Sequence, residues 1–379
     1  MIFSAPRVTA ADERVLTRIE QRRTELRFYL HRPRRWYGTL RRVTEARAIQ
    51  GSNSIEGYHS SVEDVAAIME GEEPSAADAP TRAAIGGYRD AMTYVINLAP
   101  TAPSIDASLL KSLHFMMLKH DLDKAPGQWR PGDVSVRNLD GDVVYQAPDR
   151  DLVDPLMEEL IEQIALRDAP VSIVAAMAHL NLAMIHPFTD GNGRMARCLQ
   201  TFVLASDATL SPEFASIEEY LGRNTLAYYD VLAEVGQGKW SPHRSAGPWV
   251  RFCLTAHYRQ AATLLRRVRE TEALWDRCEQ VAASHRLPDR VVGALCDACR
   301  GWRLRRPLYM KTVASSTGEE ITAASATRDL AAMVNAGLLV PSGEKRGRTY
   351  RGTEMVRSLW REIRHVRLVD TAEDPYRSD

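Results

Sequence analysis

The chain carries no excess of charge of either sign and lacks a long apolar run. Of its 379 residues, 49 are Lys or Arg and 49 are Asp or Glu, so the formal net charge is zero. This balance excludes a global electrostatic attraction to nucleic acid or membranes, although a local basic patch stays compatible with it. No run approaches the roughly 20 apolar residues that span a bilayer, because the best candidate, 171–185, contains His179 and Asn181. The first residues hold no apolar stretch suited to a signal peptide, and no membrane partner is expected.

Cysteine is also scarce, with five residues in the whole chain. Thiols so few and so scattered exclude a disulfide framework, and we therefore expect a cytoplasmic protein. Cys296 and Cys299 form one Cys-x-x-Cys pair, but a zinc site needs a second pair or a matching His pair, and none follows. The favoured interpretation is two buried thiols on one helix face, with a metal or redox role as the alternative.

Strand patterns are rare in most of the chain, and helical periodicity dominates. Apolar residues recur at spacings of three and four through much of the first half. The segments concerned are 13–27, 40–55, 62–69, 81–98, 108–119, 152–166 and 171–185. In contrast, two short alternating runs at 134–137 and 143–145 flank an Asp-Gly turn, which predicts a β-hairpin. The expected fold class is therefore mainly α with one hairpin.

Proline and glycine clusters, together with changes of pattern, divide the chain into parts. We expect an N-terminal helical region over 1–103, a helical core over 104–260, a connecting helix over 261–285 and a C-terminal domain over 286–379. The last part is expected to contain three helices followed by two strands around a basic turn, the outline of a winged helix-turn-helix.

The basic turn of this C-terminal domain suggests a nucleic-acid partner. Arginines and lysines in such a wing suit contact with DNA phosphates or the minor groove. The residues are Lys345, Arg346, Arg348 and Arg351. Protein contact or dimerisation is the alternative, because the expected recognition helix carries a single basic residue, Arg328.

The strongest chemical signal is the segment 186–197, His-Pro-Phe-Thr-Asp-Gly-Asn-Gly-Arg-Met-Ala-Arg. Gly191, Asn192 and Gly193 predict a tight turn at a helix N-terminus, where converging N–H groups and the helix dipole favour an anion. Arg194 and Arg197 lie three residues apart in the first turns of that helix. Arginines there oppose the helix dipole. Their placement is therefore favourable only if a negative group lies between them and the turn.

Two further side chains extend this chemistry. Asp190 precedes the glycines and is suited to hold a magnesium ion that bridges phosphate oxygens. His186 ends the preceding helix, where a neutral imidazole would take a proton from an incoming hydroxyl. The combination indicates phosphoryl or nucleotidyl transfer, and the missing Lys-Ser/Thr ending distinguishes it from an ordinary P-loop. His179, on the same helix face, is interpreted as a hydrogen-bonded structural histidine, with a two-histidine metal site as the alternative.

The segment matches every fixed position of the Fic signature, His-x-Phe-x-Asp/Glu-Gly-Asn-Gly-Arg-x-x-Arg, so the chain resembles the Fic family over roughly 103–258. Residues 125–130 and the expected hairpin resemble the flap that aligns a target segment. The resemblance implies a Fic helical core and transfer of AMP from ATP to a protein hydroxyl. Gly193 favours AMP transfer, because kinase-type relatives carry lysine there. Tyr228 and Tyr229 resemble tyrosines that line the adenine pocket, with ordinary aromatic core as the alternative.

The resemblance also assigns roles within the motif. His186 would be the general base that activates the target hydroxyl, and Asp190 would bind Mg²⁺. The 191–193 turn would hold the α- and β-phosphates of ATP. Arg194 and Arg197 would contact the terminal phosphates.

A second, shorter motif lies near the N-terminus. Ser52-Asn-Ser-Ile-Glu-Gly57 matches the Ser/Thr-x-x-x-Glu-Gly/Asn pattern of the inhibitory helix found in one subclass of the Fic family. Gly57 is suited to end the helix, which leaves the Glu56 carboxylate opposing the dipole of its last turn. By resemblance, Glu56 would pair with Arg197 and deny that arginine to the γ-phosphate. An ordinary surface glutamate is the alternative.

The predicted function is therefore Mg²⁺-dependent transfer of AMP from ATP to a Ser, Thr or Tyr of a protein target, self-modification included. The resemblance further implies a homodimer. One alternative is a winged-helix transcriptional regulator that only senses nucleotide, but a sensor has no need of the base His186. Another is a hydrolase that removes AMP at the same site, because the glutamate that corresponds to Glu56 supports that reaction in some relatives.

Overall fold

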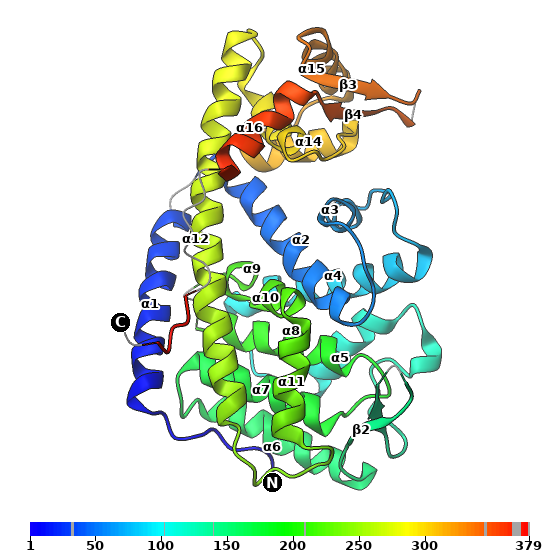
Figure 1. Ribbon diagram of the computed structural model, residues 1–379. Helices are drawn as coiled ribbons and strands as arrows, with labels where there is room; N and C mark the ends of the chain where they lie inside the picture. Colours follow the sequence, from blue (N-terminus) through cyan, green and yellow to red (C-terminus); the bar gives the residue numbers. More distant parts are fainter. Residues whose placement is uncertain are drawn as a thin grey trace.

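The computed structural model shows an elongated, mainly helical molecule (Figure 1). It describes the chain except for residues 32–33, 102, 139, 208–209, 345–346, 366–372 and 378–379. The helices are α1 (Ala10–Leu30), α2 (Tyr37–Ile55), α3 (Val62–Met69), α4 (Ala79–Leu98), α5 (Ala107–Leu118), α6 (Val153–Leu166), α7 (Val171–Ile185), α8 (Asn192–Ala205), α9 (Pro212–Ala215), α10 (Glu218–Arg223), α11 (Thr225–Gly236), α12 (Gly247–Ser284), α13 (Val292–Cys299), α14 (Arg306–Thr317), α15 (Ala323–Asn335) and α16 (Glu354–His365). The strands are β1 (Ser135–Arg137), β2 (Val143–Gln146), β3 (Leu339–Ser342) and β4 (Thr349–Gly352). Every segment with helical periodicity is a helix, with ends within a few residues of those expected.

Local side chains explain several helix starts. A side-chain oxygen at the N-cap position accepts a hydrogen bond from a backbone N–H of the first turn, which has no partner within the helix. The capping residues are Thr9 of α1, Ser61 of α3, Asp78 of α4 and Asp106 of α5. Among the described helices, none is long and apolar enough to cross a membrane.

The centre of the molecule is built on α7 and α8, which pack side by side with almost every residue buried. The α2 helix crosses α10 nearby, and Gly51 and Gly222 meet at the crossing. A Cβ atom added to Gly222 would lie 2.4 Å from the Cα of Gly51, so the two backbones approach too closely for any side chain there. This crossing buries Ser52 and Asn53 completely and fixes the C-terminal half of α2 in the core.

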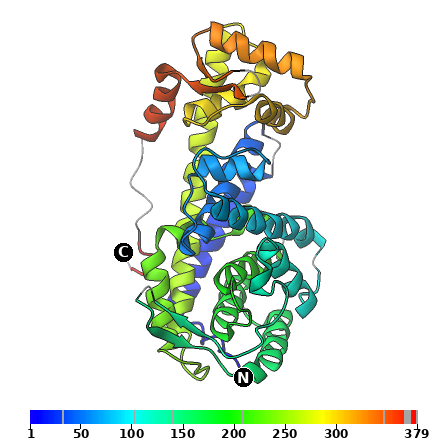
Figure 2. The ribbon, with the colours of Figure 1, turned by 90° about the vertical axis from the view of Figure 1, so that its right-hand side faces the viewer.

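The α12 helix differs from the expected organisation. A charged helix was expected to begin near residue 259, but the structure shows one continuous helix of 38 residues from Gly247. The apolar residues around Trp249 and the charged residues beyond 259 therefore belong to the same helix. Its first half packs against α1 and α7 and its second half against α13 and α16 (Figures 1 and 2). The boundary expected at 260/261 therefore falls inside a helix.

The predicted hairpin is confirmed. Strands β1 and β2 are antiparallel, with Val136 opposite Tyr145 and an irregularity between Val136 and Arg137. The turn includes Gly141, whose φ of 87° is a left-handed conformation that glycine adopts without strain. Tyr145 donates a hydrogen bond of 2.9 Å to the carbonyl of Met184, so the hairpin is attached to the end of α7.

The C-terminal part contains α13, α14 and α15, then the antiparallel pair β3–β4, then α16. Lys345 and Arg346 lie outside the described residues, and Arg348 is exposed. Arg351 is half exposed but has partners within the protein: its Nη1 donates to the carbonyl of Gly301 at 2.8 Å, and its Nη2 lies 3.9 Å from Glu63 of α3. Winged-helix function and DNA binding remain predictions for this part of the chain.

The five cysteines are buried. Cys296 and Cys299 lie in α13, and the sulfur of Cys299 is 3.7 Å from that of Cys278 in α12. Both thiols of the Cys-x-x-Cys pair therefore lie in apolar core, the environment that the favoured interpretation expects.

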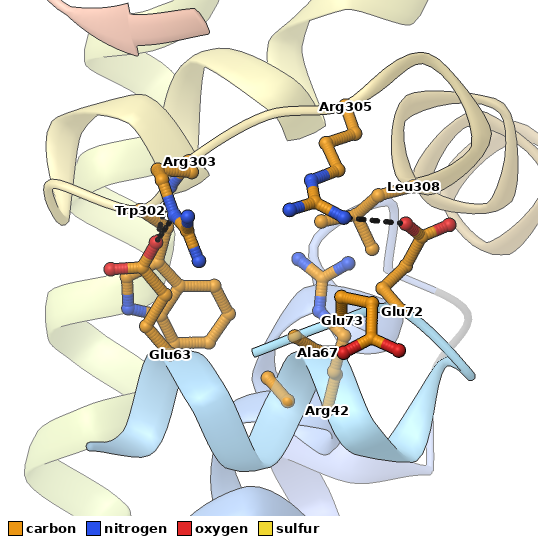
Figure 3. A pocket seen from close by; sticks show the side chains of 10 residues that line it. Arg42, Glu63, Ala67, Glu72, Glu73, Trp302, Arg303, Arg305 and Leu308 are labelled. Carbon is orange, nitrogen blue, oxygen red and sulfur yellow. Dashed lines mark hydrogen bonds and ion pairs between the residues drawn. The ribbon is translucent and has the colours of Figure 1, made fainter. Parts of the chain in front are cut away.

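Ion pairs join the C-terminal part to α2 and α3 (Figure 3). The Nε of Arg303 lies 3.1 Å from Glu63, and Arg305 lies 3.4 Å from Glu72. Behind them, Arg42 of α2 pairs with the fully buried Asp297 of α13. The N-terminal half of α2 thus rests on the C-terminal part, while its other half lies in the core.

Candidate active site

The loop between α7 and α8 has a backbone suited to bind an anion. His186 follows α7 in a left-handed conformation, and Gly191, with φ of 76°, precedes α8. The side chain of Asn192 closes the loop, because its Oδ1 accepts from the N–H of Phe188 and its Nδ2 donates to the Phe188 carbonyl, both at 2.9 Å. Since α8 begins at Asn192, the N–H groups of residues 192–194 have no acceptor within the helix. Asn192 therefore offers an anion its backbone rather than its side chain.

Arg194 carries an unsatisfied charge beside this loop. Its side chain is buried, and its Nε and Nη1 have no hydrogen-bond partner among the described residues. Its guanidinium lies 5.5 Å over the ring of Tyr58. Burial of an unpaired charge costs several kcal/mol, so the group is suited to an anionic ligand. The phosphates of ATP fit this requirement.

Arg197 is held by the end of α2. Its Nη2 lies 2.6 Å from the Glu56 carboxylate and donates to the carbonyl of Ser52 at 3.0 Å, and its Nε donates to the Ser52 hydroxyl at 2.8 Å. Burial, the largest single effect, would lower the pKa of Arg197, but the charge and hydrogen bond of Glu56 together with Tyr228 and Tyr88 outweigh it and raise the pKa. Gly57, with φ of 85°, follows the helix end at the expected position. The structure thus brings Arg197 to Ser52 and Glu56, which lie more than a hundred residues earlier in the sequence.

Gly193 faces the carboxylate of Glu56. A Cβ atom at this position would be 2.4 Å from Oε1 of Glu56. Any side chain at position 193 would therefore clash with the Glu56 side chain where it lies in this structure.

His186 has the protonation state that a general base needs. Burial lowers its pKa below the ordinary value, so the ring is neutral at pH 7. Its Nδ1 lies 3.2 Å from the carbonyl of Ala183 and must carry the proton, because a carbonyl only accepts. The other nitrogen, Nε2, is then the one with a lone pair for an incoming proton.

Asp190 is the loop's carboxylate. Its Oδ1 accepts from the N–H of Gly191 at 2.6 Å, and its Oδ2 lies 3.7 Å from the ammonium of Lys124, a residue that sequence reasoning did not single out. The carboxylate is 39% exposed. Mg²⁺ is commonly held by one or two carboxylates together with substrate phosphates and water. The donor set fits that mode of binding.

The two tyrosines have different environments. Tyr228 is buried, and its hydroxyl lies 3.0 Å from Nε2 of His179, whose Nδ1 is 2.6 Å from Gln200. Burial lowers the pKa of His179 to about 3, so the ring is neutral and structural, as the favoured interpretation expects. Tyr229 is half exposed and donates at 3.1 Å to the carbonyl of Ile55, at the end of α2. A contact with adenine therefore remains a prediction that suits Tyr229 better than Tyr228.

Arg130 is one of two buried polar residues at the loop that sequence reasoning missed. Its Nε donates to the carbonyl of His186 at 3.0 Å, and its backbone N–H donates to Pro187 at 2.8 Å. Its Nη1 donates to Gly132 at 2.6 Å, so one side chain ties the flap to the base. Arg130 ends the segment 125–130 that resembles the flap, and this position was the signal available in the sequence.

His114 of α5 is the second missed residue. Its Nε2 lies 3.0 Å from the carbonyl of Asp190, and its Nδ1 accepts from the N–H of Gly127 at 2.8 Å. The ring stacks on Phe188 at 3.7 Å. Burial lowers its pKa to about 4, so the ring is neutral. A single histidine on an apolar helix face carries no signal of such a role.

Comparison with known proteins finds similarity in the part of the chain that contains this loop. Residues 104–204 match the Fic/DOC family. The protein adenylyltransferase Fic of Nematostella vectensis is 30% identical over 249 residues, which are 62% of this chain and 54% of that protein. The chain thus spans about half the length of this curated relative.

Solved structures share the fold. A Fic family protein from Desulfovibrio desulfuricans superposes with a TM-score of 0.58 at 21% identity, over 92% of this chain and 98% of that one. A Fic domain containing signaling protein from Bacteroides thetaiotaomicron has a TM-score of 0.54 at 19% identity, over 67% and 97% of the two chains. Fic-1 from C. elegans has a TM-score of 0.52 at 20% identity, over 69% and 73%. Residues 104–204 therefore resemble the Fic/DOC family, and the chain shares the helical fold of these Fic proteins, so the resemblance predicted from 186–197 is confirmed.

Proposed function

We propose that this protein transfers AMP from ATP to a hydroxyl side chain of a protein, and that Glu56 restrains this activity through Arg197. The buried guanidinium of Arg194 carries the proposal, because it lies unsatisfied beside a helix N-terminus and requires an anion. The similarity to a protein adenylyltransferase supports a nucleotide as the source of that anion.

The proposed reaction uses the chain's own groups as follows. Nε2 of His186 takes the proton of a Ser, Thr or Tyr hydroxyl, and the oxygen attacks the α-phosphorus of ATP. A new P–O bond forms to the target, the bond to the β-phosphate oxygen breaks, and pyrophosphate leaves. The N–H groups of residues 192–194 and the charge of Arg194 stabilise the phosphates. Mg²⁺, held by Asp190, would neutralise phosphate charge when bound.

Inhibition follows from the position of Glu56. While its carboxylate occupies Arg197, that arginine cannot bind the terminal phosphate, and ATP binds with its phosphates misplaced for attack in line. A charge-assisted hydrogen bond contributes about 1.5–3 kcal/mol, which corresponds to suppression by about ten- to a hundredfold. The close crossing of α2 and α10 suggests that relief involves the Glu56 side chain, which is 26% exposed, rather than departure of the helix.

The test uses ATP labelled on either the α- or the γ-phosphate. The purified protein and its Glu56→Gly variant are incubated with each label in whole-cell lysate. Transfer of the α-label alone, stronger with Glu56→Gly, supports the proposal. Transfer of the γ-label alone would identify a kinase, and no protein labelling by either form would refute transfer.

A second candidate is removal of AMP at the same site. It is favoured by the closeness of the Glu56 carboxylate to the phosphate cradle at Gly193. A protein labelled by Glu56→Gly is purified and offered to the wild type. Release of AMP by the wild type, but not by Glu56→Gly, would support hydrolysis.

Two further partners are proposed. We infer a homodimer from the family resemblance, and a contact of the C-terminal part with DNA or protein from its basic turn. Arg351 is already engaged with Gly301 and Glu63, so the DNA interpretation depends on Arg348 within the described residues. If the full chain binds no duplex at low salt, this part is better assigned to protein contacts.

A further inference from the structure

His114 contacts the anion loop at Asp190 and Phe188, whereas Glu56 at the end of α2 faces Gly193. From α5 it reaches two segments at once: the carbonyl of Asp190 in the loop and the N–H of Gly127 ahead of the hairpin. Its ring lies flat against Phe188, with an angle of 11° between the two planes. No step of the proposed reaction uses this histidine.

We propose that His114 is a positioning residue, which holds the Asp190 peptide so that the carboxylate faces the metal and the phosphates, and which couples the flap to this loop. The proposal rests on the proposed function, because Asp190 is taken as the Mg²⁺ ligand.

Both hydrogen bonds require one tautomer of a neutral imidazole. Nε2 must donate, because the Asp190 carbonyl only accepts, and Nδ1 must accept, because the Gly127 N–H only donates. The stacking on Phe188 fixes the plane of the ring, and with it the directions of both bonds. The ring thus fixes the distance between loop and flap.

Space on this side of the loop is limited. A Cβ at Gly191 would lie 3.5 Å from Nε2 of His114 and 3.0 Å from Leu118. With its carbonyl held by His114 and Oδ1 by the N–H of Gly191, Asp190 has its Oδ2 left to face a cation, and the ammonium of Lys124 already lies 3.7 Å from it. Loss of the hydrogen bond from Nε2 frees the Asp190 peptide and therefore weakens metal binding more than nucleotide binding.

Two conservative variants separate the two ends of the imidazole. In His114→Gln the side-chain amide reaches the position of Nε2 and keeps a donor for Asp190. In His114→Asn the amide oxygen takes the position of Nδ1 and keeps the acceptor for Gly127, but the donor to Asp190 is lost. His285→Asn is the control, because that histidine is exposed at the C-terminal end of α12 and bonds only to its own helix end.

The main measurement is binding of Mn²⁺ to the protein with a non-hydrolysable ATP analogue, followed by electron paramagnetic resonance. Binding of the analogue in EDTA and the thermal unfolding midpoint are recorded for each variant. We expect His114→Asn to weaken Mn²⁺ binding by about two- to tenfold, the effect of one hydrogen bond. His114→Gln and His285→Asn should stay within about twofold of the wild type, and binding of the analogue in EDTA should not change.

The outcomes distinguish this inference from the proposed function. Equal loss of Mn²⁺ binding in the Asn and Gln variants, or loss of nucleotide binding in EDTA, would show general loosening and overturn the positioning role. Wild-type Mn²⁺ binding by His114→Asn would overturn it as well. If Mn²⁺ binding falls as expected but Glu56→Gly transfers no α-label, the positioning role stands and AMP transfer fails.

Discussion

Two basic segments of this chain, the start of α8 and the β3–β4 turn, place their arginines in opposite environments. At α8, Arg194 is buried with nitrogen atoms that lack partners in the described residues. At the turn, Arg348 is exposed and Arg351 bonds to Gly301 of its own domain. An exposed charge is hydrated and says little about a ligand, whereas an unpaired buried charge is costly. The contrast favours a ligand at α8 and leaves the partner of the turn undetermined.

The largest effect should come from His186→Ala, tested in the Glu56→Gly background. Loss of a general base lowers turnover by about a hundred- to ten-thousandfold, while ATP binding should persist because the base contacts only the attacking hydroxyl. Because burial lowers the pKa of His186 from its ordinary value of 6.5, the imidazole stays neutral at pH values at which a free histidine becomes protonated. The rate should therefore fall only at a pH below 6.5. Undiminished transfer by His186→Ala would remove the assignment.

A second prediction compares two arginines that join α2 and α3 to the C-terminal part. Arg42→Ala leaves the buried Asp297 without its closest partner and should cost about 3–5 kcal/mol of unfolding free energy. Arg305→Ala removes a longer, partly exposed pair and should cost less than about 1 kcal/mol. Chemical denaturation measures both values. Equal losses would contradict the distinction between buried and exposed pairs.

The Glu56–Arg197 pair makes a third prediction. Glu56→Gly should raise AMP transfer by about ten- to a hundredfold, the effect of one charge-assisted pair. Arg197→Ala breaks the same pair but should not activate, because Arg197 is needed for the terminal phosphate. The double variant should behave like Arg197→Ala alone, the non-additivity expected of coupled residues. Equal rates for the wild type and Glu56→Gly would end the inhibition hypothesis.

The smallest effect is expected at the β3–β4 turn. If the C-terminal part binds DNA, Arg348→Ala should lower the slope of log affinity against log salt by about one, the change for one lost phosphate contact. Arg351→Ala should change the slope less, because Arg351 bonds internally. Fluorescence anisotropy of a labelled duplex provides the measurement, and equal slopes for both variants and the wild type would argue against phosphate contact by Arg348.

These point variants are preferable to deletion of the C-terminal part. The second half of α12 packs on α13 and α16, and Arg42 of α2 reaches into the same region. A truncation near residue 286 would therefore expose core surface and leave Arg42 unpaired. Any loss of DNA binding after such a deletion would not separate a lost contact from unfolding.

Features that depend on residues close together in the chain could be predicted from the sequence. Helical spacing predicted α3 and α7 at their observed bounds, and the Asp-Gly turn predicted the β1–β2 hairpin. The segment 186–197 predicted an anion loop at a helix start, because glycine conformation and helix dipoles act over a few residues. The pairing of Glu56 with Arg197 was expected only through family resemblance, since no local pattern links residues so distant in the chain.

Contacts between distant segments became known only from the folded chain. It placed His114 and Arg130 on the loop, turned the side chain of Asn192 inward, and joined Tyr228 to His179 in the core. It also merged the expected core end and connecting helix into α12. Each outcome depends on which apolar faces pack together and which buried polar atoms then find partners. Helical periodicity identifies an apolar face but not the neighbour that covers it.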